Sequence, residues 1–175
     1  DAVLVIRTHG VGRDVLELSH KRAKKVMDLT CPYVAKIHNV VARYSADGYD
    51  IVIVGDRMHP EVMGIEGWCQ NGAHIVYEEE EAERLVLDRV CVVAQTTINK
   101  NKFDNLIKII KNNCKEVVIF DTICKSTKIR QQEAEEIAKT SDVVFVVGGR
   151  GSSNTKKLFD ICKANCPLTF LIESF

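Results

Sequence analysis

Short apolar runs rich in β-branched residues alternate along the chain with longer amphipathic stretches. The apolar runs cover residues 3–6, 51–54, 74–77, 90–94, 117–120, 143–147 and 169–172. The stretches between them include residues 14–26, 32–47, 101–112 and 125–139, which we expect to be helices. Nearly continuous apolar strands separated by helices are typical of parallel sheets covered on both faces. The pattern therefore predicts an α/β fold with right-handed crossover connections.

The chain also repeats itself with an offset of 93 residues. Asp28-Leu29-Thr30-Cys31 recurs as Asp121-Thr122-Ile123-Cys124, and Val54-Gly55 falls on Val147-Gly148. Each unit has the same order: cysteine, helix, apolar strand, glycine and polar loop. Self-similarity over this length indicates a repeated structural unit. We therefore expect Cys31 and Cys124 to occupy equivalent positions.

Charge and composition narrow the functional classes. The 24 basic and 24 acidic residues balance, so no basic field indicates a nucleic-acid partner. The sequence contains no run of 18 apolar residues, so it predicts no membrane span, and no signal peptide is recognisable. Seven scattered cysteines fit a reducing, cytoplasmic setting better than a disulfide scaffold. Both ends of the sequence look cut, so we expect a piece of a longer protein.

Polar side chains follow four of the predicted strands. They include His9 after the first run, His59 and Glu61 after the second, Thr96 after residues 90–94, and Ser152, Ser153 and Asn154 after residues 143–147. Ligands of parallel α/β sheets bind beyond the carboxyl ends of the strands. The following helices offer unpaired N–H groups there, which suit phosphate. Turn and helix-cap roles would also explain these residues, but four such loops favour a phosphorylated or carboxylated small ligand.

The glycine-rich loop Gly148–Asn154 matches neither common nucleotide motif. It lacks the Gly-Lys-Ser/Thr ending of a P-loop, and Asn154 stands where the dinucleotide fingerprint has glycine. Nicotinamide and ATP chemistry are therefore not indicated.

Two of the seven thiols stand apart from the others. Pro32 directly follows Cys31, and Pro60 directly follows His59. Proline favours the first turn of a helix, so both preceding residues are expected at helix N-termini. A helix N-terminus favours thiolate, which can be a nucleophile or a metal ligand. Close-spaced zinc pairs are missing, and well-separated cysteines fit an iron–sulfur cluster better.

The remaining cysteines have a structural explanation. Cys91 lies within an apolar run, and Cys162 and Cys166 are four residues apart on a predicted helix. We expect these three thiols, with Cys69 and Cys114, to fill core positions as small apolar groups.

Taken in order, the motifs resemble one known family. They are Thr8–Val11, Asp28–Pro32, Lys36–His38, His59–Val62, Gln95–Thr97, Asp121–Cys124 with Arg130-Gln131, and Ser152–Asn154. They are similar to the LytB/IspH family of hydroxymethylbutenyl diphosphate reductases, and the resemblance covers essentially the whole chain. It implies similar α/β domains in a pseudo-threefold trefoil around a [4Fe-4S] cluster. It also implies the last step of the non-mevalonate isoprenoid route, in which an allylic diphosphate loses its hydroxyl group.

The resemblance also implies roles for individual residues. Cys31 and Cys124 match two of three cluster ligands, which leave one iron open as a Lewis acid. Glu61 matches the proton donor, and Thr96 a member of its hydrogen-bond relay. The diphosphate-binding positions are His9, His59, Ser152, Ser153 and Asn154. Two electrons would come from a ferredoxin- or flavodoxin-like partner.

The departures from the family are informative. The family's first ligand cysteine and a late substrate serine have no counterpart in this sequence. Residues 1–30 would form the end of a first domain, 31–121 a second, and 122–175 most of a third. We expect this stretch alone to be inactive. Three alternatives remain open: a phosphate-binding α/β module with structural cysteines, a thiol enzyme with Cys31 as nucleophile, and, less favoured, a zinc site.

Overall fold

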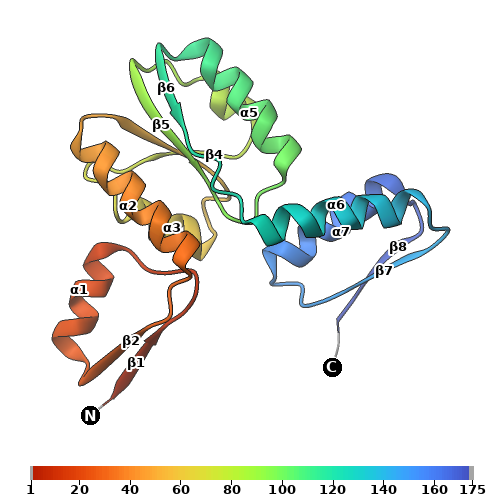
Figure 1. Cartoon of the computed structure of the whole chain (residues 1–175), viewed down its shortest axis with the longest axis horizontal. Helices are drawn as coiled ribbons and strands as arrows, with labels where there is room; N and C mark the ends of the chain where they lie inside the picture. The colour runs from red at the N-terminus through yellow and green to blue at the C-terminus, as the bar shows by residue number, and fades with distance from the viewer. Residues whose placement is uncertain (1, 174–175) are drawn as a thin grey trace. The chain divides into compact units, whose positions relative to one another are not determined.

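Fifteen helices and strands make up the part of the chain that the computed structural model describes, residues 2–173 (Figure 1). They are β1 (Val3–Ile6), α1 (Arg13–Arg22), β2 (Lys25–Asp28), α2 (Pro32–Ala46), β3 (Asp50–Val54), α3 (Pro60–Glu66), β4 (His74–Val76), α4 (Glu79–Glu83), β5 (Arg89–Ala94), α5 (Lys100–Asn113), β6 (Glu116–Ile119), α6 (Lys125–Lys139), β7 (Val144–Val147), α7 (Ser153–Asn165) and β8 (Thr169–Ile172). Among these residues, no helix combines the length and the apolar character needed to cross a membrane.

The chain folds into two compact units. The first unit runs to Thr96 and resumes over Asn101–Thr122; the second comprises Thr97–Lys100 and the residues from Ile123 onward. The first unit contains a four-stranded sheet of order β4-β3-β5-β6 and the pair β1-β2, and the second contains the pair β7-β8. Every named pair is parallel. The predicted α/β class with parallel sheets is confirmed.

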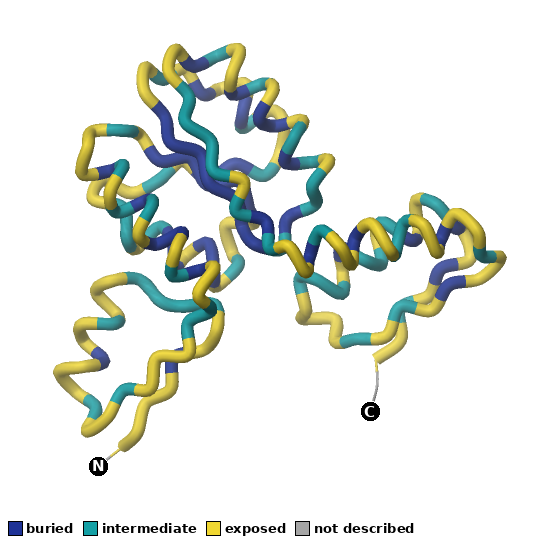
Figure 2. Tube along the Cα trace, viewed as in Figure 1, coloured by how far each residue is buried: buried dark blue, intermediate teal, exposed yellow. Residues whose placement is uncertain are grey.

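The two inner strands of the four-stranded sheet, β3 and β5, are buried on both faces after their first residue, as their apolar sequences require, whereas the edge strand β6 is only half-buried (Figure 2). Successive strand residues point to opposite faces. On one face Ile51, Ile53 and Val93 pack with Ile37 of α2 and Ile65 of α3. Four residues of α5 are also buried: Phe103, Leu106, Ile107 and Ile110. The sheet therefore gives a rigid platform for the loops that leave its strands.

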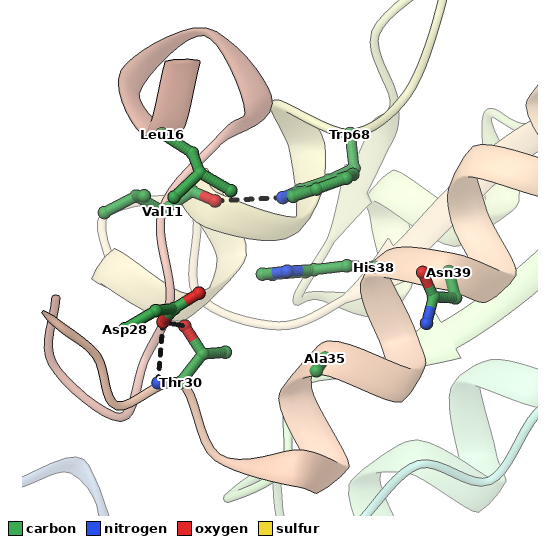
Figure 3. Close-up of a pocket in the computed structure, with 8 residues that line it drawn as sticks. All are labelled: Val11, Leu16, Asp28, Thr30, Ala35, His38, Asn39 and Trp68. Atoms are coloured by element: carbon green, nitrogen blue, oxygen red, sulfur yellow. Dashed lines mark hydrogen bonds between the residues drawn. The ribbon is translucent and has the colours of Figure 1, made fainter. Parts of the chain in front are cut away.

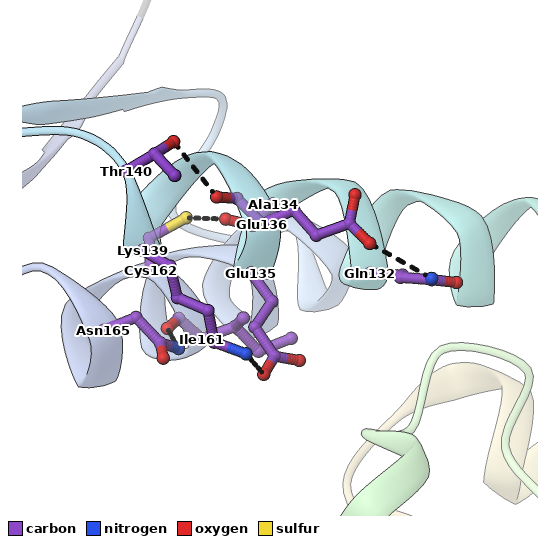
Figure 4. A network of polar contacts seen from close by, with 9 residues as sticks. All are labelled: Gln132, Ala134, Glu135, Glu136, Lys139, Thr140, Ile161, Cys162 and Asn165. Atoms are coloured by element: carbon purple, nitrogen blue, oxygen red, sulfur yellow. Dashed lines mark hydrogen bonds and ion pairs between the residues drawn. The ribbon is translucent and has the colours of Figure 1, made fainter.

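In the second unit, α6 and α7 pack against each other beside β7 and β8. Their core contains Ala138, Val144, Cys162 and Cys166, as expected for two structural cysteines. The Cys162 thiol donates to the carbonyl oxygen of Ala134, 3.6 Å away, in the network drawn in Figure 4. An ion pair between Lys139 and Glu135 lies on the solvent side of the same helix, α6.

One element differs from the prediction. The helix expected over residues 14–26 ends at Arg22, and Lys25–Asp28 forms β2 instead. This strand is mostly exposed and carries charged residues at both ends, so it has no apolar run to mark it. Parallel pairing with Val3–Ile6 holds it in place, an interaction that local sequence does not reveal.

The internal repeat is visible in the structure. Helices α2 and α6 both have 15 residues and begin 93 positions apart, at Pro32 and Lys125. Helices α3 and α7 begin with the same offset, at Pro60 and Ser153. The cysteine, helix, strand and loop order inferred from the sequence is thus a repeat of structural elements. The division into three domains proposed above stays a prediction.

Two glycines allow the β1-β2 layer to approach α3 closely. The Arg13 amide donates to the carbonyl oxygen of Gly67, 3.2 Å away. A Cβ atom on Gly67 would lie 2.6 Å from the Cα of Gly12, a distance at which backbone must move. The absence of a side chain at Gly67 is therefore a packing requirement.

We expect Gly67→Ala to destabilise the first unit by about 1–3 kcal/mol, because overpacking displaces backbone atoms. Urea unfolding followed by far-UV circular dichroism measures this change. Gly149→Ala is the control: its Cβ would meet no atom within 4 Å, so its effect should stay below about 0.5 kcal/mol. Equal effects of the two substitutions would contradict the packing argument.

Candidate functional site

A buried carboxylate lies at the start of α3 in the first unit. Glu61 is 2% exposed. The amide of Thr96 donates to its Oε1 at 2.6 Å, and the Thr96 hydroxyl donates to its Oε2 at 2.7 Å. Both carboxylate oxygens are thus bonded to one residue that follows β5. A buried carboxyl group with a hydroxyl partner is suited to proton transfer.

Two histidines are connected to Glu61. His59 contacts the Glu61 backbone, and His9 contacts the ring of His59. His59 caps α3, and its Nδ1 accepts a hydrogen bond from the Glu61 amide at 3.2 Å. In a neutral His59 ring the proton is therefore on Nε2. The His9 ring meets the His59 ring edge to face, with centroids 5.4 Å apart. The Nδ1 of His9 is buried and has no hydrogen-bond partner among residues 2–173.

The loop between β3 and α3 is fixed by backbone and side-chain hydrogen bonds. The Asp56 amide donates to Oε1 of the fully buried Gln95, 3.0 Å away. The Asp56 side-chain carboxylate accepts a hydrogen bond from the Met58 amide, and the Asp56 backbone carbonyl oxygen accepts one from the His59 amide. These contacts set where α3 begins, so they set the positions of His59 and Glu61.

The second unit has its own polar loop at the start of α7. Ser152 is the N-cap, and its hydroxyl accepts from the Thr155 amide at 3.3 Å. The hydroxyl groups of Ser153 and Thr97 lie 3.2 Å apart. Asn154 is half-buried in the first turn of the same helix. The structure therefore brings Ser152, Ser153 and Asn154 together at one helix N-terminus, where backbone N–H groups favour an anion.

Cys31 and Cys124 occupy matching positions in the two units. Each is the N-cap of a 15-residue helix, with φ/ψ of −56°/133° at Cys31 and −59°/133° at Cys124. Both are half-buried, and neither thiol is used to cap its own helix within the described chain. Equivalent, uncommitted thiols at helix N-termini have the chemistry of metal ligands.

The donor set suits iron–sulfur ligation in kind, but it is incomplete as a metal site. Within the described residues, no three His, Cys, Asp or Glu side chains form a group that could hold a metal ion. The other five cysteines are committed elsewhere. Cys91, Cys114, Cys162 and Cys166 are buried, and Cys69 donates to the carbonyl oxygen of Ile65. Two thiols of this chain thus remain as candidate ligands.

The comparisons with known proteins identify the family. The model of the family described as LytB protein matches residues 1–175, the whole sequence. The chain belongs to the LytB family. Curated relatives include the 4-hydroxy-3-methylbut-2-enyl diphosphate reductases of Alkaliphilus oremlandii and of Caldanaerobacter subterraneus subsp. tengcongensis. The first is 47% identical over 99% of this chain and 63% of its own length; the second is 45% identical over 97% and 59%.

Solved structures agree with this assignment. A structure of (E)-4-hydroxy-3-methyl-but-2-enyl diphosphate reductase matches 98% of this chain and 63% of its own, with 38% identity and a TM-score of 0.66. The Plasmodium falciparum reductase matches 97% of this chain and 55% of its own, with 29% identity and a TM-score of 0.89. The LytB chain thus spans about 60% of the length of the relatives given above.

The sequence located the candidate residues but not how they pair. The first unit brings Glu61, Thr96, His59 and His9 together, and the second gathers the serines and Asn154. Two supporting contacts were missed. The Thr97 hydroxyl lies against Ser153, and the Gln131 side-chain amide donates to the carbonyl oxygen of Ile98, 3.2 Å away. The Arg130-Gln131 pair was noted as a family motif, and that was the available signal.

His38 is a buried packing residue in the structure. It is 4% exposed and stacks on Trp68, with ring centroids 5.1 Å apart and 15° between the planes. Figure 3 shows it between Trp68 and Asp28, beside a cavity of about 130 Å³. Burial lowers the pKa of His38 to about 4, although the Asp28 carboxylate acts in the opposite direction. His38 is therefore neutral at physiological pH.

This pKa predicts a pH-dependent stability. Unfolding exposes His38 and restores a pKa of 6.5, so the unfolded state takes up a proton first as the pH falls. The resulting loss of stability begins near pH 6.5 and reaches about 2–3 kcal/mol by pH 4.5. His38→Phe should lack this component. Urea unfolding monitored by the fluorescence of Trp68, the single tryptophan, measures it at pH 7.5 and 4.5. Equal pH-dependent losses in both proteins would contradict a buried neutral His38.

Proposed function

We propose that this chain supplies the proton donor and much of the diphosphate site of a 4-hydroxy-3-methylbut-2-enyl diphosphate reductase. The observation that carries the proposal is the Glu61–Thr96 pair, a buried carboxyl group that accepts hydrogen bonds at both oxygens. The Glu61 backbone amide donates to His59, whose ring contacts His9. The family and the names of the relatives support the same reaction.

The reaction explains why such a carboxyl group is needed. Two electrons and two protons enter; the allylic C–O bond breaks, the hydroxyl group leaves as water, and a new C–H bond gives isopentenyl or dimethylallyl diphosphate. Hydroxide is a poor leaving group, so a proton must reach the departing oxygen. Glu61, once protonated, would donate to Thr96 Oγ1 across the 2.7 Å contact that joins the two groups, and the Thr96 hydroxyl would pass its own proton to the departing oxygen.

The diphosphate would be held by imidazole, hydroxyl and amide donors. In the first unit these are His9 and His59, and in the second they are Ser152, Ser153 and Asn154. An unpaired buried imidazole nitrogen such as Nδ1 of His9 costs free energy until a ligand or water bonds to it. The first-turn amides of α7 add N–H groups that suit phosphate oxygens.

Cys31 and Cys124 would hold a [4Fe-4S] cluster together with a third cysteine that has no match in this sequence. When bound, the cluster supplies electrons and a Lewis-acidic iron for the leaving oxygen. A ferredoxin- or flavodoxin-like donor would reduce it, in the cytoplasm. With two of the three ligands, the 175 residues alone should not turn over the substrate.

The alternative, a phosphate-binding module with structural cysteines, gives no reason for two uncommitted thiols in matching helix caps.

Glu61→Gln in the full-length protein should lower turnover by about 10²–10³-fold, because the amide preserves the shape but cannot donate the proton. KM for the diphosphate substrate should change little. The control is Glu66→Gln, at the end of the same helix, which should leave turnover unchanged. Retention of full turnover by Glu61→Gln would remove Glu61 as the donor.

Cys31→Ser in the full-length protein should lower iron and acid-labile sulfide to a small fraction of the parent content, since one of three thiolate ligands is lost. Both are measured after anaerobic purification. Cys91→Ala is the matched control, because Cys91 is 0% exposed within the sheet. Unchanged iron in Cys31→Ser would favour the phosphate-binding module or a thiol enzyme.

A further inference from the structure

The loop that carries His9 is held from two sides. On one side, the Cys31 amide at the start of α2 donates to the carbonyl oxygen of Thr8, 3.0 Å away. On the other side, Nε1 of Trp68, just beyond α3, donates to the carbonyl oxygen of Val11 at 2.9 Å. The loop therefore spans the space between the candidate thiol helix α2 and the candidate acid helix α3.

His38 fills the space between these two anchors. It lies two helical turns beyond Cys31 on α2, and its ring stacks on Trp68 (Figure 3). The guanidinium group of Arg13 lies over the same Trp68 ring, 5.1 Å from its centroid. The His38 ring is thus one layer of a stack that joins the two helices.

The edge of the His38 ring also defines the turn after His9. Gly10 has φ of +69°, a left-handed conformation that favours glycine. A Cβ atom on Gly10 would lie 2.6 Å from Cε1 of His38 and 3.1 Å from Cγ2 of Thr30. The turn therefore rests against His38, and any displacement of this ring changes where the preceding residue, His9, can lie.

The ring acts through its shape rather than through a hydrogen bond of its inner nitrogen. Nε2 of His38 is buried and has no hydrogen-bond partner in the described part of the chain. A buried polar atom without a partner costs free energy, so Nε2 does not hold the ring in place. The stack on Trp68 and the contact with Gly10 do, and an apolar aromatic ring would make both contacts.

We propose that His38 is a positioning residue for His9. It fixes the Gly10 turn against α2 and Trp68, and so holds the His9 imidazole beside His59 for the diphosphate group. The inference rests on the proposed function, because it needs His9 to contact the ligand. It adds a residue that never touches the substrate and acts through a backbone turn.

The test measures binding of inorganic diphosphate to the full-length protein by calorimetry. We expect His38→Ala to weaken binding about tenfold or more, since small displacements of positioned groups have large effects. His38→Phe keeps the aromatic layer and should stay within about twofold of the parent. Ile37→Ala is the matched control: Ile37 is the preceding residue, 1% exposed, and packs in the core under α2. It should lower thermal stability without a change in affinity.

A double-mutant cycle with Gly10→Ala tests the contact itself. Gly10→Ala should weaken diphosphate binding more in the parent than in His38→Ala, where the clash with Cε1 is gone. Strictly additive effects would overturn the proposed contact. If His38→Ala does not fold, His38→Leu, which lacks the planar stack, takes its place in the cycle.

His9→Asn separates this inference from the proposed function. If His9→Asn leaves diphosphate affinity unchanged, the assignment of His9 to the substrate is wrong. If His9→Asn weakens binding but His38→Ala binds like Ile37→Ala, the positioning role of His38 is wrong and the proposed function stands.

Discussion

A buried carboxylate must find hydrogen-bond donors, and Glu61 finds both of its donors in Thr96. That pairing depends on the parallel register of two neighbouring strands, in which Val54 of β3 lies beside Ala94 of β5. The strands end level with each other, so the loop after β3 and the loop after β5 start at the same edge. Because α3 begins within hydrogen-bonding reach of Thr96, the positions of His59 and, through the ring contact, His9 follow from the same register.

Much of this framework can be predicted from local sequence. The apolar runs of the central sheet are long enough to give strands, and proline after Cys31 and His59 correctly marks two helix starts. The strand β2 could not be predicted this way. Lys25 and Asp28 bound a segment that is mostly exposed, and only pairing with β1 makes it a strand. The local sequence pattern predicts a strand correctly where the segment itself is apolar and buried. It fails where a strand forms only by pairing with a neighbouring strand.

The same distinction applies to the candidate site. The sequence shows which loops carry polar residues, because each follows an apolar run. It does not show that Thr96 bonds to Glu61, 35 residues away, or that His38 stacks on Trp68. These pairings depend on strand order and on helix packing, which no spacing rule encodes. The position of the His38 ring also explains why residue 10 must be glycine, which the sequence alone does not show. Gly10 is left-handed, and a side chain there would meet His38.

The repeat shows how one geometry can carry two chemistries. His59 and Ser152 are equivalent N-caps, and each accepts a hydrogen bond from the first turn of its helix. The cap requirement is met in both units, by an imidazole in one and a hydroxyl in the other. Two positions on, Glu61 corresponds to Asn154, so an ionisable carboxyl group in the first unit stands where the second has a neutral amide. Backbone geometry is thus shared, whereas at this pair of positions only the first unit has a carboxyl group.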